Sequence, residues 1–183
     1  MEVNNARKIR NLALVGFMGT GKSSVGRSVA GDLGFHFMDT DELIEARAGR
    51  RISELFALEG EAAFRERESG LVAELAKMER SVISTGGGLV VNPLNLASLK
   101  SHALVVCLWA SPAMIWQRTR HQSHRPLLQG EDPQAKIRQL LADREPSYRQ
   151  ADVLVNTDMR SVKEVAQQIL YQFHRARTDP PKS

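Results

Sequence analysis

The chain contains a single cysteine, Cys107, which lies within a run of apolar residues. One cysteine cannot form an intramolecular disulfide, and it cannot supply a cysteine-ligated zinc or iron–sulfur site. The five histidines show no metal-ligand spacing with acidic residues or cysteine, so we interpret them as solvent-facing or structural. These observations favour a protein of the reducing cytoplasm.

Long apolar runs and aromatic residues are also scarce. The first apolar run, Leu12–Val15, is too short for a secretion signal and far shorter than the roughly 20 residues of a membrane span. With 5% aromatic residues, the chain has few side chains on which nucleic-acid bases could stack. The basic residues are scattered rather than banded, so the net charge of +4 and the pI near 9.5 suit a small anion. We therefore expect neither a membrane nor a nucleic acid as a partner.

The 183 residues fit one domain, because single cores typically serve about 100 to 200 residues. We expect this domain to span residues 1–183 and to be a monomer, with its core at about 11–173 and a flexible tail at 177–183. Hydrophobic residues make up 42% of the chain and charged residues 25%, a profile that excludes disordered and fibrous proteins.

Short apolar runs alternate with helical periodicity along the chain. The apolar runs predict strands at 11–16, 35–38, 81–84, 103–109 and 153–155. The periodic segments predict helices at 23–33, in short pieces on both sides of Gly49, at 61–78, after Ser111 and Pro112, at 134–148 and over 162–173. This alternation predicts a parallel sheet with helices on both faces, because parallel neighbours need crossover connections. Ligands of such sheets bind at the carboxyl ends of the strands, where loops begin at Gly16, Asp39, Thr85 and Trp109.

The segment from Gly16 to Ser23 matches the phosphate-binding pattern G-x-x-x-x-G-K-[ST] between a predicted strand and a predicted helix. Its glycines allow successive backbone N–H groups to turn inward, and the start of the helix adds a positive dipole end. In this pattern Lys22 reaches the β- and γ-phosphates of a nucleotide, and the hydroxyl of Ser23 is a ligand for Mg²⁺. The pattern therefore predicts a loop that binds a nucleoside triphosphate.

Two carboxylates, Asp39 and Asp41, follow the second predicted strand. One could face the magnesium ion of the phosphate loop while the other faces an adjoining pocket. Taken alone, an aspartate at this place is more often the N-cap of the following helix. The sequence leaves both roles open.

Arg65 and the three glycines at 86–88 are further candidates. In the segment 61–78 we expect the apolar side chains to face the core and the charged ones, Arg65 and Glu68 among them, to face elsewhere. Arg65 alone is consistent with a solvated helix face that carries ion pairs. Three consecutive glycines exceed the needs of a tight turn, which suggests that the backbone there approaches a ligand.

The polar segment 120–133 lacks apolar periodicity, and loops of this length often act as lids or binding loops. Arginines lie in and around it, at Arg118, Arg120, Arg125 and Arg144. A mobile arginine near a transferring phosphate stabilises the charge that grows in the transition state, and a fixed one clamps a carboxylate. Each of them alone could equally be surface charge.

Together, and in this order, the segments resemble the shikimate kinase family of P-loop small-molecule kinases. The similar segments are GFMGTGKSSVG at 16–26, DTD at 39–41, FRERE at 64–68, STGGG at 84–88, RPLL at 125–128 and R-x-x-x-Y at 144–148. The resemblance implies a three-layer α/β/α fold with a five-stranded parallel sheet and a mobile lid at about 120–133. It also implies ATP-dependent, Mg²⁺-assisted phosphorylation of the 3-hydroxyl of shikimate, which yields shikimate 3-phosphate and ADP on the route to aromatic amino acids.

The same resemblance assigns residue roles. It implies that the nucleotide is bound by Gly19, Thr20, Gly21, Lys22, Ser23, Ser24, Arg118, Arg125 and Arg160, with Arg118 against adenine. It implies that shikimate is bound by Asp41, Arg65, Gly86, Gly87, Gly88 and Arg144. Magnesium is implied to contact Ser23 and, through water, Asp39, and the catalytic residues are implied to be Lys22, Asp41 and Arg125. Ser24, Ser84 and Val162 depart from residues that are commoner in the family, which bears on nucleotide affinity.

Two alternative functions remain open. One is another P-loop small-molecule kinase, acting on gluconate or on a nucleoside monophosphate. The other is a regulatory module that binds a nucleotide without transferring phosphate. A nucleoside monophosphate needs binding groups for a second phosphate and a base, which the set of Arg65, the glycines and Arg144 suits less well than it suits a compact hydroxy acid. Retention of Lys22, Ser23 and Asp41 argues against the regulatory module.

Overall fold

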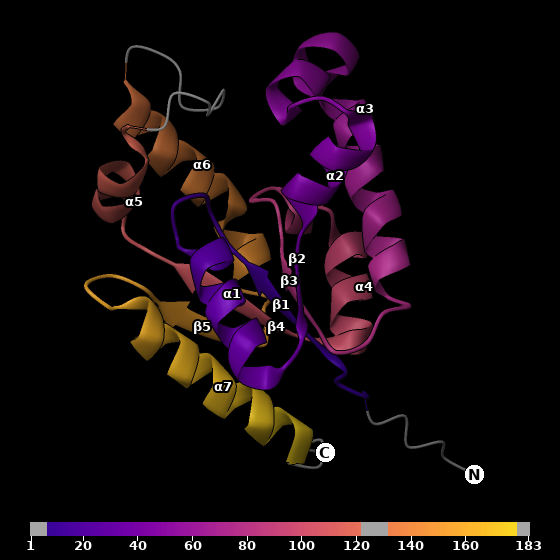
Figure 1. Cartoon of the computed structure of the whole chain (residues 1–183). Coiled ribbons are helices and arrows are strands. Elements are labelled where there is room, and N and C mark those ends of the chain that lie inside the picture. Colours follow the sequence, from indigo (N-terminus) through magenta and orange to yellow (C-terminus); the bar gives the residue numbers. More distant parts are fainter. Residues whose placement is uncertain (1–6, 122–131, 179–183) are drawn as a thin grey trace.

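The computed structural model describes residues 7–121 and 132–178, and within them five strands form one sheet (Figure 1). The strands are β1 (Asn11–Val15), β2 (His36–Asp39), β3 (Ser81–Ser84), β4 (Ala103–Trp109) and β5 (Val153–Asn156). Their order is β2-β3-β1-β4-β5, and every neighbouring pair is parallel. The predicted α/β class is confirmed, and each predicted strand differs from the observed one by no more than one residue at either end.

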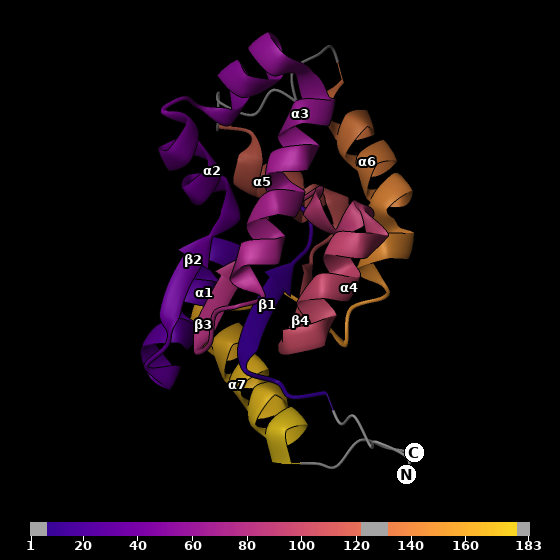
Figure 2. The same ribbon diagram turned by 90° about the vertical axis from the view of Figure 1, so that its right-hand side faces the viewer.

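Helices cover both faces of this sheet. They are α1 (Lys22–Leu33), α2 (Thr40–Ala48), α3 (Ile52–Leu75), α4 (Pro93–His102), α5 (Pro112–Thr119), α6 (Pro133–Tyr148) and α7 (Val162–Thr178), with a short 3₁₀ turn η1 (Leu89–Val91). In Figures 1 and 2, α3 and α4 lie on one side of the sheet and α7 lies on the other. In the part of the chain that the structure describes, no helix combines the length and the apolar character that a membrane crossing requires.

The central strand β1 shows why its sequence is apolar without interruption. Leu12 and Leu14 point into the core beneath α1 and α7, whereas Ala13 and Val15 point into the core beneath α3, α4 and α6. Successive side chains of a strand face opposite sides, so a strand covered on both faces must be apolar at every position. The phosphate-binding pattern begins at the carboxyl end of β1, so the burial of β1 fixes where the pattern lies.

Several helix boundaries follow the predicted local signals. Ser111 caps α5, because its Oγ accepts a hydrogen bond of 3.3 Å from the backbone N–H of Met114, and Pro112 occupies the first turn. Gly49 ends α2 in the left-handed conformation (φ 62°).

The segment at 120–133, expected to be a lid, lies mostly outside the described residues, and Arg125 lies there as well. Helix α7 continues to Thr178, so residues 177 and 178 of the expected tail are helical.

Other boundaries differ from the predictions. The helix predicted at 61–78 is the second part of α3, whose first part begins at Ile52 and is separated from it by a non-helical Gly60 (φ 83°, ψ 173°). Met78, expected on the apolar face, lies beyond the end of the helix at Leu75 and is exposed. Helix α4 was not predicted, although Asn92 caps its first turn by accepting a hydrogen bond of 3.0 Å from Leu94 N–H.

Asp152, in the connection from α6 to β5, holds the beginning of β4. Its carboxylate accepts hydrogen bonds from the backbone N–H of Val105 (2.8 Å) and from both terminal nitrogens of Arg7 (2.9 and 2.6 Å). Burial raises the pKa of Asp152, but the hydrogen bonds from Arg7 and Val105 outweigh this effect and hold the pKa below its ordinary value. The ionised carboxylate therefore stabilises the fold.

We expect Asp152→Asn to lower the free energy of unfolding at neutral pH by roughly 1.5 to 3 kcal/mol, because hydrogen bonds to a charged group are lost. The folded-state pKa of Asp152 is depressed, so its contribution is present above the unfolded pKa and is lost as the pH falls through the folded pKa. The difference between wild type and variant should therefore shrink below about pH 4. Urea unfolding between about pH 3 and 7 measures it, with Asp32→Asn, at an exposed position on α1, as the control. A difference that does not change with pH would contradict this account.

Candidate functional site

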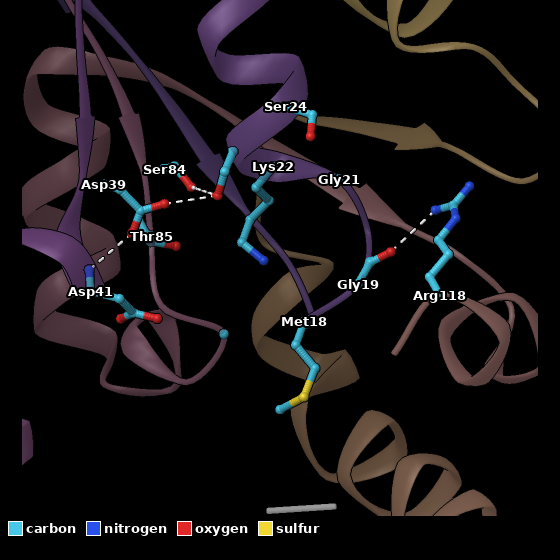
Figure 3. A pocket seen from close by; sticks show the side chains of 12 residues that line it. Met18, Gly19, Gly21, Lys22, Ser24, Asp39, Asp41, Ser84, Thr85 and Arg118 are labelled. Carbon is cyan, nitrogen blue, oxygen red and sulfur yellow. Dashed lines mark hydrogen bonds between the residues drawn. The ribbon is translucent and has the colours of Figure 1, made fainter. Parts of the chain in front are cut away.

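A cavity of about 370 Å³ lies at the carboxyl ends of β1, β2 and β3 (Figure 3). Its lining comprises Met18, Gly19, Gly21, Lys22, Ser23, Ser24, Asp39, Asp41, Ser84, Thr85, Gly87 and Arg118. The register of the sheet brings these segments together, because Ser84 lies opposite both Leu14 of β1 and Asp39 of β2. The cavity is therefore at the edge of the sheet where the sequence predicts ligand binding.

The loop between β1 and α1 depends on glycine for two reasons. Gly16, Gly19 and Gly21 have φ values of 128°, 76° and 92°, which disfavour any other residue. A Cβ atom at Gly16 would also lie 2.1 Å from the carbonyl oxygen of Leu108. The side chain of Thr20 is buried and donates to the carbonyl oxygen of Phe17 (2.8 Å), so it stabilises the loop itself. Together these features hold the backbone of the loop beside the side chain of Lys22 (Figure 3).

Lys22 and the first turn of α1 supply positive charge to this loop. The Nζ of Lys22 donates to the carbonyl oxygens of Gly16 and Phe17, at 2.8 Å each. No side chain caps the N-terminus of α1, and no acidic residue lies in its first turn. The N–H groups of that turn and the ammonium group thus form an environment that attracts an anion.

Asp39 fills one of the two roles that the sequence leaves open, that of an N-cap, and it also contacts the phosphate-binding pattern. Its Oδ1 accepts a hydrogen bond from the backbone N–H of Asp41 (3.1 Å), which makes it the N-cap of α2. Its Oδ2 accepts a hydrogen bond from Oγ of Ser23 (2.8 Å), shown as a dashed line in Figure 3. One carboxylate therefore both begins α2 and faces the phosphate-binding pattern.

The oxygen atoms of Ser23 and Asp39 fit a magnesium ion of the kind found beside bound phosphates. Magnesium prefers oxygen ligands and is usually held by one or two protein groups together with phosphate and water oxygens. Among the described residues, no three His, Cys, Asp or Glu side chains are grouped so that they could hold a metal ion. A hard cation here would thus depend on oxygen atoms of a bound substrate.

The glycines at 86–88 lie where charged side chains converge. A Cβ at Gly86 would lie 2.5 Å from Oδ1 of Asp41, and a Cβ at Gly88 would lie 2.7 Å from Nη1 of Arg65. None of these glycines has a positive φ, so their small size matters here rather than their conformational freedom. Protein side chains thus approach the backbone at 86–88 closely, and contact of these glycines with a ligand stays a prediction.

Arg65 forms ion pairs, but on a face that is only partly solvated. Its Nη1 donates to Oε2 of Glu68 (2.7 Å) and its Nη2 to Oε1 of Glu61 (2.8 Å). The side chain of Glu68 is 1% exposed, which contradicts the expectation that it faces away from the core. Burial raises the pKa of Glu68, and Arg65 opposes that increase.

The sequence contains a signal for the burial of Glu68, which the prediction of an outward-facing side chain did not use. Glu68 follows Phe64 by four residues and precedes Leu71 by three, so it lies in the apolar stripe of α3. A carboxylate in such a stripe needs a cationic partner, and Arg65 is one turn away. Its Oε1 has no hydrogen-bond partner among the described residues and lies 3.0 Å from where a Cβ of Gly86 would be.

Arg144 reaches the same glycines from α6. It is 9% exposed, and its guanidinium group lies over the ring of Phe17 at 5.6 Å from the ring centre. A Cβ at Gly87 would lie 3.5 Å from its Nη1. The structure therefore brings Arg65, Arg144 and Asp41 to the same three glycines.

The remaining predicted residues fall into three groups. Arg118 lines the cavity and donates to the carbonyl oxygens of Gly19 (3.2 Å) and Thr157 (2.7 Å), and Ser24 is an exposed lining residue. Arg160 does not line the cavity; it donates to the carbonyl oxygen of Asn156 at 3.2 Å. Arg125 lies outside the described residues.

Comparisons with known proteins agree on one family. Residues 18–174 match the sequence model of the family described as "Shikimate kinase". The shikimate kinase of Thermodesulfovibrio yellowstonii is 42% identical over 167 residues, which cover 91% of this chain and 96% of that protein. The shikimate kinase of Cupriavidus pinatubonensis is 46% identical over 167 residues, covering 91% of this chain and 87% of the relative.

Solved structures give the same result. The structure of shikimate kinase from Acinetobacter baumannii in complex with shikimate has a TM-score of 0.89 and 38% identity, and the match covers 94% of this chain and 97% of that one. A gluconokinase from Sinorhizobium meliloti has a TM-score of 0.58 but only 18% identity, with 92% and 94% of the two chains covered. The second likeness shows a common fold and nothing further.

We expect Gly16→Ala to lower the free energy of unfolding by about 3 kcal/mol or more, because the added Cβ collides with backbone and the positive φ is strained. Gly31→Ala is the matched control. It lies on an exposed turn of α1 with no atom within 4 Å of the added Cβ, and alanine should stabilise the helix there by about 0.5 to 1 kcal/mol. Urea unfolding of both variants measures these effects. Equal stability of Gly16→Ala and wild type would show that the loop does not need its observed conformation.

Proposed function

The chain belongs to the shikimate kinase family, and we propose that it transfers the terminal phosphoryl group of ATP to the 3-hydroxyl of shikimate. The observation that carries this proposal is the pairing of two environments at one edge of the sheet. One is the phosphate-binding pattern with Lys22 and Ser23, and the other is the set of Asp41, Arg65 and Arg144 around three glycines. The first suits nucleotide phosphates, and the second suits a small acid with hydroxyl groups.

At the nucleotide end, Lys22 binds the β- and γ-phosphates. Its ammonium group already lies within the loop, so bound phosphate oxygens replace the carbonyl oxygens of Gly16 and Phe17 as acceptors. Gly19, Thr20 and Gly21 offer backbone N–H groups, with Ser24 next to them. Arg118, fixed to Gly19 and Thr157, lies against the base. Arg160 contacts the nucleotide from the loop after β5, and Arg125, outside the described residues, remains a predicted phosphate ligand.

The hydroxyl of Ser23 and, through water, the carboxylate of Asp39 would hold a magnesium ion. When bound, this ion would supply positive charge that offsets the negative charge of the phosphates during transfer. The hydrogen bond of 2.8 Å between Ser23 and Asp39 keeps both oxygen atoms turned toward the phosphate loop. The N-cap bond from Asp41 N–H orients the same carboxylate from the other side.

At the acceptor end, Arg65 and Arg144 bind the carboxylate of shikimate, because a guanidinium group matches a carboxylate with two parallel hydrogen bonds. Asp41 accepts hydrogen bonds from ring hydroxyls and orients the 3-hydroxyl beside the glycines. The hydroxyl oxygen forms a bond to the γ-phosphorus as the bond to the bridging oxygen of ADP breaks, and the proton passes to Asp41 or to solvent. Because this transition state is loose, orientation and neutralisation of charge contribute more than a strong base.

A single catalytic domain that acts as a monomer in the cytoplasm, with a lid at about 120–133, remains our expectation. A lid that closes only over both substrates would exclude water and limit hydrolysis of ATP.

The proposed function is tested by an acceptor panel. Purified protein with ATP and Mg²⁺ is given shikimate, gluconate or AMP, and the release of ADP is followed in a coupled assay. We expect turnover with shikimate alone, a product phosphorylated at O3 by ³¹P and ¹H NMR, and no turnover with 3-deoxyshikimate. Turnover on gluconate or AMP without turnover on shikimate would contradict the proposal. Tight nucleotide binding without any phosphorylated acceptor would favour the regulatory module.

Arg65→Ala should raise the KM for shikimate roughly ten- to a hundredfold, because charge-assisted hydrogen bonds to the substrate carboxylate are lost. The KM for ATP should stay within about twofold, since Arg65 does not line the phosphate loop. Arg67→Ala is the matched control on the same helix, where the exposed Arg67 pairs with Glu59, and it should leave both KM values unchanged. Equal increases in both KM values for Arg65→Ala would contradict the assigned role.

Gly88→Ala provides a second test that keeps Arg65 and its partner Glu68. The added Cβ would occupy space 2.7 Å from Nη1 of Arg65, and the guanidinium group can move away because it ends a flexible side chain. We therefore expect a raised KM for shikimate with little change in melting temperature. Gly70→Ala, with no atom within 4 Å of its Cβ, is the control for the substitution itself.

A further inference from the structure

Tyr148, the last residue of α6, contacts the middle of the three glycines at 86–88. Its side chain is buried, with 6% of the residue exposed, and its hydroxyl donates to the carbonyl oxygen of Gly87 at 2.6 Å. A hydroxyl this deeply buried needs a hydrogen-bond acceptor, since leaving it without one is costly. The contact therefore links the end of α6 to the loop after β3.

Gly87 occupies the boundary between the two ends of the proposed site. A Cβ at Gly87 would lie 3.5 Å from Nη1 of Arg144, 3.5 Å from the backbone nitrogen of Met18 and 3.6 Å from the carbonyl oxygen of Gly16. Gly87 itself lines the cavity. A shift of Gly87 would thus change the space between Arg144 and the phosphate loop.

Three consecutive glycines do not by themselves keep a loop in one conformation, because the backbone of glycine has more conformational freedom than that of any other residue. Side chains from two helices hold this loop at its beginning and its middle. The backbone N–H of Gly86 donates to Oγ1 of Thr40 (2.9 Å), and the carbonyl of Gly87 accepts from Tyr148. Removal of one anchor should therefore increase the range of loop conformations.

Tyr148 and Arg144 also act on each other. They are one helical turn apart on α6, so their side chains lie on the same face. Burial raises the pKa of Tyr148 to about 12, and the positive charge of Arg144 only partly offsets this increase. The phenol therefore stays protonated and can donate its hydrogen bond throughout the neutral pH range.

We propose that Tyr148 is a positioning residue for the acceptor, whose hydroxyl holds the Gly87 carbonyl and thereby sets the distance between the glycines and Arg144. This inference rests on the proposed function, in which these groups bind shikimate. If only a fraction of molecules has the loop in place, the apparent affinity for the acceptor falls by that fraction. The nucleotide end, which has its own glycine-dependent loop and Lys22 contacts, is affected little.

The chain offers a matched pair of variants, because it has two tyrosines and the other, Tyr171 on α7, is exposed. Tyr148→Phe should raise the KM and the Kd for shikimate about five- to tenfold, as expected for loss of one hydrogen bond. The KM for ATP and kcat should change less than about twofold. Tyr171→Phe, which removes the same hydroxyl from a surface position, should change none of these values.

Each result decides for or against the inference. A lower melting temperature of Tyr148→Phe with an unchanged KM for shikimate would reduce Tyr148 to a structural residue, and equal increases in both KM values would also overturn the proposal. If wild type does not phosphorylate shikimate, the proposed function is wrong and this inference is wrong with it. If wild type is active and Tyr148→Phe is indistinguishable from it, only the inference is wrong.

A second measurement does not depend on the folding of Tyr148→Phe. Replacement of tyrosine by 3-fluorotyrosine in the Tyr171→Phe protein places one fluorine label, at Tyr148. We expect its ¹⁹F signal to shift when shikimate is added, because the acceptor changes the surroundings of Arg144 and Gly87. A signal that does not respond to saturating shikimate would overturn the inference.

Discussion

The parallel hydrogen bonding of β1, β3 and β2 sets the positions of the three loops that meet at the site. Ser84 of β3 is level with Leu14 on one side and with Asp39 on the other. The phosphate loop, the cap of α2 and the glycines at 86–88 therefore begin at the same height. The backbone N–H of Thr85 then donates to the carbonyl of Leu14 at 3.0 Å, which ties the third loop to the strand that carries the first. The two substrates can be brought together because these strand ends are side by side.

Charged side chains are distributed unequally between the nucleotide end and the acceptor end of the site. The nucleotide end uses backbone groups, one ammonium group and few side chains, whereas the acceptor end uses charged side chains from α2, α3 and α6. Glu68 is buried beside Arg65 at the acceptor end, where burial raises the pKa of the carboxyl group and the guanidinium group opposes that increase. The same carboxylate holds the guanidinium group of Arg65 close to Gly88. The cost of burying Glu68 is thus linked to the placement of Arg65, the group that we propose binds the acceptor.

The sequence predicted the sheet, its strand ends and the phosphate loop because these follow from local rules. Apolar runs, a glycine pattern of fixed spacing and the Ser111 cap each act within a few residues. Long-range packing decided the rest. The link between Tyr148 and Gly87, for example, joins residues 61 positions apart, which no local pattern indicates. Helix α4 was missed although Asn92 caps it and Pro93 occupies its first turn, both of which are local signals.

The glycines of the phosphate loop and those at 86–88 differ in how easily their surroundings can change in evolution. Gly16 cannot be replaced without moving the backbone of β4, so the half of the cavity that it shapes resists change by a single substitution. Gly86 and Gly88 do not have positive φ values, and the atoms nearest to an added Cβ belong to the side chains of Asp41, Glu68 and Arg65. Single substitutions among those three side chains can resize this half without rebuilding a strand. A lineage that inherits this scaffold can therefore acquire new acceptors by point mutation while it keeps the same phosphate donor.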